Sequence, residues 1–386
     1  MSATLVRAVP ANAAECGEIL ADATRNHRTV RVCGSGTKSY VGDIEPADVE
    51  LGTSAIAGVV DHVPADLTVT VRAGTRITHL AAALAQAGQF LPLDPPHPDD
   101  ATIGGVIAAN SNGFWRTRYG GVRDLLIGTE TALADGTVAR AGGRVVKNVA
   151  GYDLDKLLVG SFGTLGVIVE ATFKVLPQPA ASEGIFAELA RSPDVFAAAH
   201  AIVRGASPVA ACVVERGEGD TWRLAVEARG TASAVRRAIQ DARREITVRH
   251  GRAAELGDDL GRLRELPARA TDGALVRVAL PVAATAPFAD TAAGLETFAA
   301  LVADAASGVT RVHLAGDDDA VIQDAEALLL AARVVSGAGR VERRGERLRT
   351  RLPAWPQRPS GDALMRRVKD MFDPAHVLEP GRSAFA

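Results

Sequence analysis

The sequence has few cysteines. Cys16, Cys33 and Cys212 are the three in 386 residues, and no two of them form a Cys-x-x-Cys pair. A self-contained zinc or iron–sulfur site is therefore not expected, and neither is a disulfide scaffold. This composition fits a reducing compartment, so we expect a cytoplasmic protein without a metal site.

Long apolar runs are also missing. No uncharged apolar stretch reaches 18 residues, so no membrane span is expected. The first 15 residues lack a basic segment followed by an apolar one, so no signal peptide is expected. A peripheral position at the inner face of the plasma membrane stays open.

An excess of positive charge is absent as well. The 43 basic residues are matched by 46 acidic ones, for a net charge of -3, so nucleic acid is not an expected partner. What the chain does have is length and apolar content, with 47% hydrophobic residues. These suit two or three domains with large cores, and we expect domains at 1–178 and 179–360 before a final segment at 361–386.

Glycine-rich turns follow the predicted strands of the N-terminal half. A β-rich run at 29–33 stops at Gly34-Ser35-Gly36-Thr37, where backbone without a Cβ can approach a ligand. Taken alone, such a motif is more often a plain tight turn. A second run at 67–72 alternates like a half-buried strand. A helix should follow it, with Thr75 as its N-cap and Gly88 as its C-terminal glycine.

A proline-rich segment and a run of small residues come next. Residues 92–98 (PLDPPHP) cannot form a helix or a central strand, so they predict a stiff loop. Residues 102–113 are mostly glycine and small side chains, which suits backbone lying against a flat ligand. Two strands joined by a turn at Asp135-Gly136 are expected within 125–138, and a further strand at 167–175.

The pattern changes after Pro179. The expected strands are 209–215, 221–227, 275–281 and 309–314, and the expected helices are 231–245, the second half of the alanine-rich stretch 283–305, and 320–334. Strands and helices in this order are typical of an α+β domain with an antiparallel sheet. Residues 340–360 are basic and interrupted by proline, which predicts a linker. A last helix, ended by Pro374, should place Leu364, Val368 and Met371 on one face.

Taken together, these segments resemble a known family. The pieces that match the FAD-binding domain of the vanillyl-alcohol oxidase and p-cresol methylhydroxylase (PCMH) type stand in family order: RVCGSGTKSYVG at 31–42, VRAGT at 71–75, DATIGGVIAANSNGFWRTRYGGVRDLLIG at 100–128 and LLVGSFGTLGVI at 157–168. The segment 368–382 (VKDMFDPAHVLEPGR) resembles the closing segment of related FAD-linked oxidases. The segment 142–157 (GGRVVKNVAGYDLDKL) is most similar to the small FAD-binding E subunits of bacterial glycolate oxidases.

The resemblance implies a fold and a cofactor. The fold would be α+β, with a PCMH-type two-part FAD-binding domain at 1–178 and an antiparallel-sheet cap domain of the FAD-linked oxidase C-terminal type at 179–360. The segment 361–386 would return to the FAD domain. The residues expected to hold FAD are Gly34, Ser35, Gly36, Thr37, Lys38, Ser39, Gly74, Pro95, Thr102, Ile103, Gly104, Gly105, Asn110, Ser111, Gly113, Gly163, Gly166, Val167 and Ile168.

Many relatives of this family attach the flavin covalently to a histidine or a cysteine. No histidine lies in 31–42, Cys33 stands before the loop in the predicted strand, and His97 in the proline segment is the nearest alternative. We therefore expect non-covalent FAD.

The residues that would act on a substrate are less defined. Catalytic relatives carry a His-Gly-Asp-Gly-Asn-His cluster for metal and substrate, whereas the nearest segment here, VHLAGDDDA at 312–320, has one histidine, His313. Arg277 is a candidate for pairing with a substrate carboxylate. The alternative is that Arg277 is an ordinary strand arginine that faces solvent. Arg116 and Tyr119 are further candidates for phosphate or substrate contacts. Lys147 and Asn148 would face the flavin or a partner subunit.

The resemblance implies an FAD-binding subunit of a glycolate oxidase complex. It would oxidise glycolate or a similar 2-hydroxy acid beside a larger FAD subunit and an iron–sulfur subunit. Two alternatives remain, a stand-alone FAD oxidoreductase for another hydroxy acid or alcohol, and a non-catalytic subunit that keeps the flavin fold. A Rossmann NAD enzyme is disfavoured because the turn at Gly34 lacks the third glycine of GxGxxG.

Overall fold

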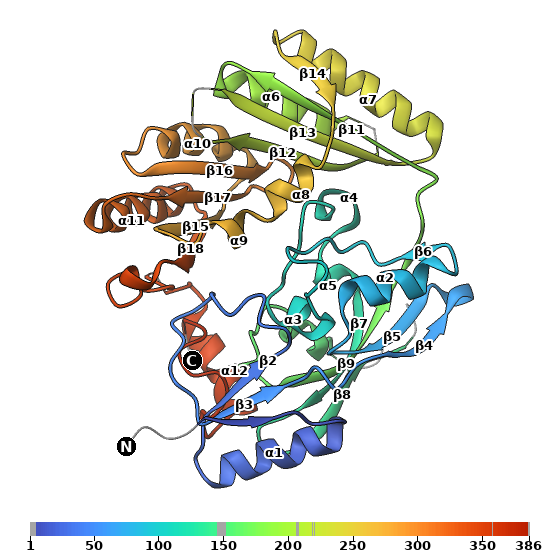
Figure 1. The fold of residues 1–386 in the computed structure, drawn as a ribbon, viewed down its shortest axis with the longest axis vertical. Coiled ribbons are helices and arrows are strands. Elements are labelled where there is room, and N and C mark those ends of the chain that lie inside the picture. Colours follow the sequence, from blue (N-terminus) through green and yellow to red (C-terminus); the bar gives the residue numbers. More distant parts are fainter. Residues whose placement is uncertain are drawn as a thin grey trace. The chain divides into compact units, whose positions relative to one another are not determined.

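The computed structural model divides into two compact units. It describes residues 5–144, 152–205, 208–217, 219, 221–356 and 358–384. The first unit comprises 1–112, 120–178 and 358–386, and the second comprises 113–119 and 179–357. The fold is mixed helix and sheet with antiparallel sheets, as the sequence predicts (Figure 1).

A small parallel sheet opens the first unit. Its strands are ordered β1-β3-β2, with bounds Val6–Ala8, Val49–Gly52 and Val30–Cys33. Helix α1 (Ala13–Arg25) has Asn12 as its N-cap, and the buried face of this helix carries Cys16, Leu20 and Ala23. These side chains pack with Val30, Val49 and Leu51 in one apolar cluster, so β2 is fixed just before the first glycine turn.

A larger antiparallel sheet completes the core of the first unit. Its order is β4-β5-β9-β7-β8, with bounds Val59–Val63, Thr68–Arg72, Val167–Lys174, Leu126–Ala132 and Val138–Gly142. The predicted turn at Asp135-Gly136 joins β7 to β8, and Gly136 has a φ of +91°, which glycine adopts without strain. Helices α2 (Ile77–Ala85) and α3 (Ile103–Ala108) share one apolar cluster with β5 and β9.

The smaller elements of the first unit surround this sheet. They are β6 (Gln89–Phe90), β10 (Leu176–Pro177), η1 (Pro64–Asp66), α5 (Val122–Leu125), η2 (Leu154–Leu157) and α12 (Asp362–Phe372). The sequence predicted Thr75 as the N-cap of α2, and this prediction is wrong. The N-cap is Arg76, because the Thr75 hydroxyl is bound to the backbone N–H of Gly58 at 2.8 Å.

The second unit is built on an eight-stranded antiparallel sheet. Its order is β14-β11-β13-β12-β16-β17-β15-β18, with bounds Arg252–Glu255, Ala181–Leu189, Trp222–Gly230, Val209–Arg216, Phe298–Asp304, Val309–Leu314, Ala274–Ala279 and Ala338–Arg344. The long helices α6 (Ser192–Arg204), α7 (Ala232–Thr247), α10 (Thr285–Ala293) and α11 (Asp318–Val334) pack against these strands (Figure 1).

Short elements complete the second unit. They are α4 (Arg116–Tyr119), α8 (Asp259–Arg264), α9 (Leu266–Arg269), η3 (Val282–Ala284) and η4 (Glu346–Leu348). In β15, Ala274, Val276 and Val278 face the cluster that contains the long helices. Because side chains alternate along a strand, Leu275 and Arg277 face the other side. Within the described chain, each helix is too short or too polar to pass through a membrane.

Three further predictions made from the sequence are wrong in detail. The helix in 283–305 lies in the first half (α10), and the second half is the strand β16, which pairs with β12 and β17. The expected linker at 340–360 begins within the strand β18. On α12, Leu364 and Met371 are exposed, and the buried residue is Lys369.

A substitution at Phe173 tests the packing of the core of the first unit. Its side chain is fully buried in β9, between β5 and β7. We expect Phe173→Ala to lower the free energy of unfolding by about 3–5 kcal/mol, because it leaves a cavity that the sheet cannot close. Urea unfolding followed by circular dichroism measures this loss. Met371→Ala, at an exposed position, is the control, and an equal loss in both variants would contradict the assignment.

Candidate functional site

The first glycine loop, residues 34–39, follows β2. Ser39 N–H donates to the Gly36 carbonyl at 3.0 Å, and Gly36 has a φ of +75°. Lys38 Nζ reaches the Pro96 carbonyl at 3.3 Å, which joins the loop to the predicted proline segment that also contains Pro95. Ser35 and Thr37 complete the loop, and it therefore has a defined turn geometry tied to a second, stiff loop.

Gly34 lies against Thr102. A Cβ at Gly34 would stand 2.3 Å from Thr102 Oγ1. This distance is shorter than real Cβ atoms show to a neighbouring atom, so one of the two residues would have to shift. Thr102 is the N-cap of α3, and its hydroxyl accepts from Gly105 N–H. The first loop and the start of the 102–111 run therefore touch at Gly34, which lies against the Thr102 side chain and has no room for a Cβ.

A cavity opens beside this contact. It has a volume of about 670 Å³, and four of the predicted cofactor residues, Gly34, Ser35, Gly74 and Thr102, line it together with Ser54, Ala57, Gly58, Val59, Thr75, Arg76, His79 and Asp100. His79 of α2 lies on the wall of this cavity. Arg76 and Asp100 form a loose ion pair at 3.9 Å.

A third loop, residues 160–166, is bound to the end of α3. Gly160 N–H donates to the Ile107 carbonyl at 3.1 Å, and Phe162 N–H donates to the Ala108 carbonyl at 2.8 Å. A Cβ at Gly163 would lie 3.5 Å from Val32 Cβ in β2. The loops at 34–39, 102–111 and 160–166 are therefore neighbours in the first unit.

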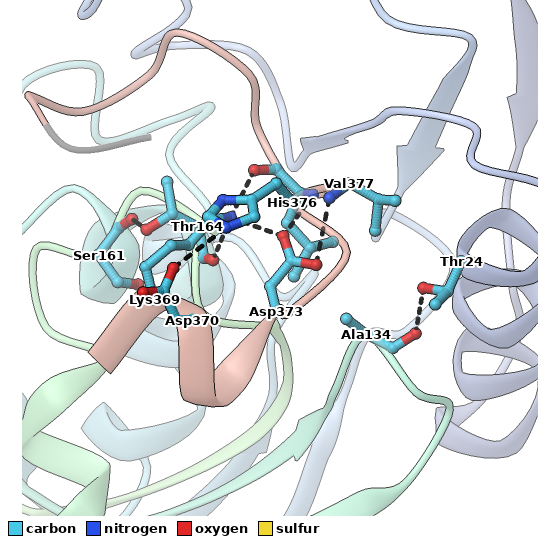
Figure 2. Close-up of polar contacts among 10 residues, drawn as sticks. Thr24, Ala134, Ser161, Thr164, Lys369, Asp370, Asp373, His376 and Val377 are labelled. Carbon is cyan, nitrogen blue, oxygen red and sulfur yellow. Dashed lines mark hydrogen bonds and ion pairs between the residues drawn. The ribbon is translucent and has the colours of Figure 1, made fainter. Parts of the chain in front are cut away.

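The buried ammonium of Lys369 joins the C-terminal segment to the third loop. Its three donors are all used: Nζ donates to the Thr164 carbonyl at 2.9 Å, the Leu378 carbonyl at 2.9 Å and the Asp373 carboxylate at 2.6 Å (Figure 2). Asp373 in turn accepts from Val377 and Leu378 N–H. Burial lowers the pKa of Lys369, and the Asp373 carboxylate opposes that shift.

Two more buried charges join the same segment to the first loop. Glu379, 2% exposed, accepts from Val32 N–H at 2.7 Å. Arg382 donates to the carbonyls of Lys38 and Ser39 at 3.0 and 3.3 Å. Burial raises the pKa of Glu379, and the guanidinium of Arg382 opposes that shift. The segment 369–382 therefore binds both sides of the loop cluster.

The remaining predicted residues have varied positions. Ile103 is fully buried, and Gly104 is packed on Ala73, where a Cβ would stand 2.9 Å from the Ala73 Cβ. Val167 and Ile168 are buried in β9, next to Gly166. Asn110 has a φ of +46° at the end of α3, beside Ser111. Gly113 belongs to the second unit.

The candidate substrate residues lie in the second unit. Arg277 of β15 is paired in register with Arg311 of β17 and with Arg340 of β18. Cross-strand partners lie on one face of a sheet, so these three form a row, which we call the arginine row. Glu342, also in β18, is 6% exposed and accepts from Arg311 Nε at 2.7 Å and from Arg340 at 3.4 Å.

Charge in the arginine row is unbalanced. Burial and the neighbouring Arg340 lower the pKa of Arg277 to about 9. Burial acts to raise the pKa of Glu342, but Arg311, Arg340 and Arg277 outweigh it and lower the pKa to about 2. Glu342 is therefore ionised at neutral pH, and it is a single carboxylate among three guanidinium groups.

Arg116 and Tyr119 lie in the segment 113–119. The indole of Trp115 donates to Glu227 at 2.8 Å, and the Thr117 hydroxyl donates to Asp304 at 3.3 Å, which fixes this segment on the second sheet. His313, the one histidine of the segment 312–320, contacts the Asp272 carbonyl through Nε2 at 3.0 Å. Lys147 and Asn148 lie outside the described residues.

Comparison with known proteins finds a family match in the N-terminal part of the chain. A family model described as an FAD binding domain matches residues 4–142. Glycolate oxidase subunit GlcE of Escherichia coli is 43% identical over 157 residues, which cover 40% of this chain and 45% of that subunit. The match spans less than half of the length of that relative.

Residues 4–142 are an FAD binding domain. Two further comparisons extend over nearly the whole chain. An uncharacterized FAD-linked oxidoreductase of Mycobacterium tuberculosis is 26% identical over 97% of this chain and 89% of its own. A solved alkyldihydroxyacetonephosphate synthase shares the fold, with a TM-score of 0.74 at 16% identity over 97% of this chain and 75% of that one.

The residues of the loop cluster fit FAD. A pyrophosphate needs N–H donors on backbone that can come close, and the contact of Gly34 with Thr102 leaves space for no side chain. The sequence did not single out Lys369, Glu379 or Arg382 as supports of this cluster. Their signal was available, since a lysine and an aspartate four residues apart stand among apolar residues in VKDMFDP.

Gly34→Ala should weaken FAD binding. The new Cβ would displace the Thr102 hydroxyl and with it the cap of α3, so we expect the dissociation constant of FAD to rise by about tenfold or more. Fluorescence titration of the apoprotein with FAD measures the constant. Gly217→Ala, at a site with nothing within 4 Å, serves as the control. Unchanged FAD affinity in Gly34→Ala would refute the role of this contact.

Lys369→Met should destabilise the first unit and release FAD. Removing one partner of a buried ion pair leaves the other charge uncompensated, which costs about 3–5 kcal/mol. Arg366→Met on the exposed side of α12 breaks a surface pair with Asp362 and should cost about 0–1 kcal/mol. Thermal unfolding and flavin retention on gel filtration compare the two variants. Equal retention in both would count against a link between Lys369 and the cofactor.

Proposed function

We propose that this chain is the FAD-binding subunit of a complex that oxidises a small 2-hydroxy acid. The observation that carries the proposal is the cluster of three loops in the first unit, with Gly34 against Thr102 and Lys369 bound to Thr164. The similarity to a glycolate oxidase subunit makes the oxidation of glycolate to glyoxylate the first reaction to test. Its three separate cysteines favour action in the cytoplasm, free or at the inner face of the membrane.

The loop cluster would hold the cofactor without a covalent bond. Backbone N–H groups of 34–38 would face the pyrophosphate, and the 102–111 and 160–166 loops would complete the cradle. When bound, FAD supplies a ring that accepts a hydride equivalent from a carbon–hydrogen bond. Cys33 stands before this loop, and burial raises the pKa of its thiol, which keeps it in the unreactive protonated form.

The second unit would bind the acid. Arg277 would take a carboxylate in the bidentate manner of guanidinium groups, and Arg116 and Tyr119 would lie beside it. Electrons would leave through partners, since the match to a protein named as a subunit supports a complex of several subunits. The resemblance at 142–157 makes a larger FAD subunit and an iron–sulfur subunit the partners that we propose.

A stand-alone FAD-dependent oxidoreductase acting on CH–OH donors is the second candidate. The observation that favours it is the match to an FAD-linked oxidoreductase over 97% of the chain. In that case the arginine row would serve a complete active site rather than one shared with partners.

Expression with and without its partners separates the two candidates. We expect the purified chain to show bound flavin absorbance that is lost to the supernatant on acid precipitation. Turnover of glycolate with an artificial electron acceptor should be at least about tenfold faster in the co-purified complex than in the chain alone. Full turnover by the isolated chain would refute the subunit proposal, and an absence of flavin would refute both candidates.

A further inference from the structure

Two arginines of the second unit have no counter-charge bound to them. Glu342 is shared by Arg311 and Arg340. In the part of the chain that the structure describes, the guanidinium groups of Arg277 and Arg116 form no hydrogen bond and no ion pair. Both lie on one face of the sheet. Thr117, the neighbour of Arg116, donates to Asp304 of β16, and Val302, two residues before Asp304 on that strand, is in register with Arg311 of the arginine row. Arg116 also contributes to the lowered pKa of Arg277.

The nearby carboxylates are already occupied. Asp304 accepts from the Thr117 hydroxyl at 3.3 Å, from the Ser307 hydroxyl at 2.6 Å and from the backbone N–H of Ala306 at 3.0 Å. Among the described residues, Glu342 and Asp304 are therefore bound by other groups, and neither is hydrogen-bonded or ion-paired to Arg277 or Arg116. Half-buried cations without partners cost free energy that a bound anion would recover.

A further donor lies at the end of the arginine row. The guanidinium of Arg340 lies over the Trp355 ring, 5.3 Å from its centroid. The indole Nε1 of Trp355 is buried and has no hydrogen-bond acceptor among the described residues. This indole is a hydrogen-bond donor beside the arginine row, and donors of this kind bind anionic ligands.

We propose that Arg277 and Arg116 form a binding site for a small dicarboxylate, with one carboxylate on each guanidinium. The inference rests on the proposed function and narrows it, because the acid oxidised by the complex would carry a second carboxylate besides the one next to its hydroxyl group. Glycolate would occupy Arg277 and leave Arg116 without an anion.

Two separate carboxylates fit this site better than one doubly charged group. Arg277 is on the strand β15, whereas Arg116 is on α4, so the two guanidinium groups come from different elements. Each planar guanidinium can hold one carboxylate through two parallel hydrogen bonds. A phosphate ester has the same charge on one centre, and it would have to share its oxygens between both arginines.

Calorimetric titration of the FAD-loaded full chain tests the site. Succinate and butyrate both have four carbons, and neither has a hydroxyl group to oxidise, so binding is measured apart from turnover. At fixed ionic strength, we expect succinate to bind at least about tenfold more tightly than butyrate. Methyl phosphate is the third probe, and it should bind more weakly than succinate.

Matched variants assign the effect to the two arginines. Arg277→Met and Arg116→Met should each reduce succinate binding to the level of butyrate. Arg277→Lys keeps the charge without the planar fork, so it should bind succinate with intermediate affinity. Arg237→Met on α7 removes one charge at a side chain that is 83% exposed and should change nothing. If the methionine variants fail to fold, Arg277→Lys and Arg116→Lys replace them in the titration, and each should bind succinate less tightly than the unmodified chain.

Several outcomes would overturn the proposal. They are equal binding of succinate and butyrate, methyl phosphate binding as tightly as succinate, or an equal loss in Arg237→Met. Tight succinate binding in a complex that oxidises no 2-hydroxy acid would refute the proposed function and leave the dicarboxylate site standing. Rapid glycolate oxidation with no preference for succinate over butyrate would refute the dicarboxylate site and leave the proposed function standing.

Discussion

The buried ammonium of Lys369 is the interaction on which the loop cluster of the first unit depends. An ammonium taken out of water is costly unless all of its donors are satisfied, and here two carbonyls and the Asp373 carboxylate satisfy them. The carbonyls belong to Thr164 and Leu378, more than 200 residues apart in the chain. The charge therefore enforces a meeting of segments that no local signal would bring together.

The meeting of these segments determines the geometry of the glycine loops. Once Lys369 holds the C-terminal segment, Glu379 can accept from Val32 N–H and Arg382 can bind the carbonyls of Lys38 and Ser39. A loop with two glycines has little of its own to hold it in one conformation. Here the buried charges of the C-terminal segment fix the loop through its backbone, and Gly34 has no Cβ where it lies against Thr102.

Sequence patterns predicted the regular elements better than the charged ones. The alternation at 67–72 and the glycine turns after β2 and β7 correspond to elements of the structure, because they reflect local geometry. The alanine-rich stretch 283–305 misled because alanine favours helix, while the pairing of β16 with β12 and β17 decides its second half. Residues 340–360 indicated a solvated linker because charge usually marks solvent, but Arg340 and Glu342 lie in a paired strand.

The segment 113–119, which carries Arg116, connects to the first unit at both of its ends. It leaves the first unit immediately after Asn112 and returns to it at Gly120. Asn112 holds both ends of this segment, since its side chain donates to the Asn110 carbonyl and accepts from Val122 N–H. The run that the sequence assigned to the cofactor is therefore covalently continuous with a residue of the proposed anion site. A ligand on Arg116 would act on a segment whose anchor, Asn112, directly follows the run at 102–111 that the sequence predicts to hold the cofactor.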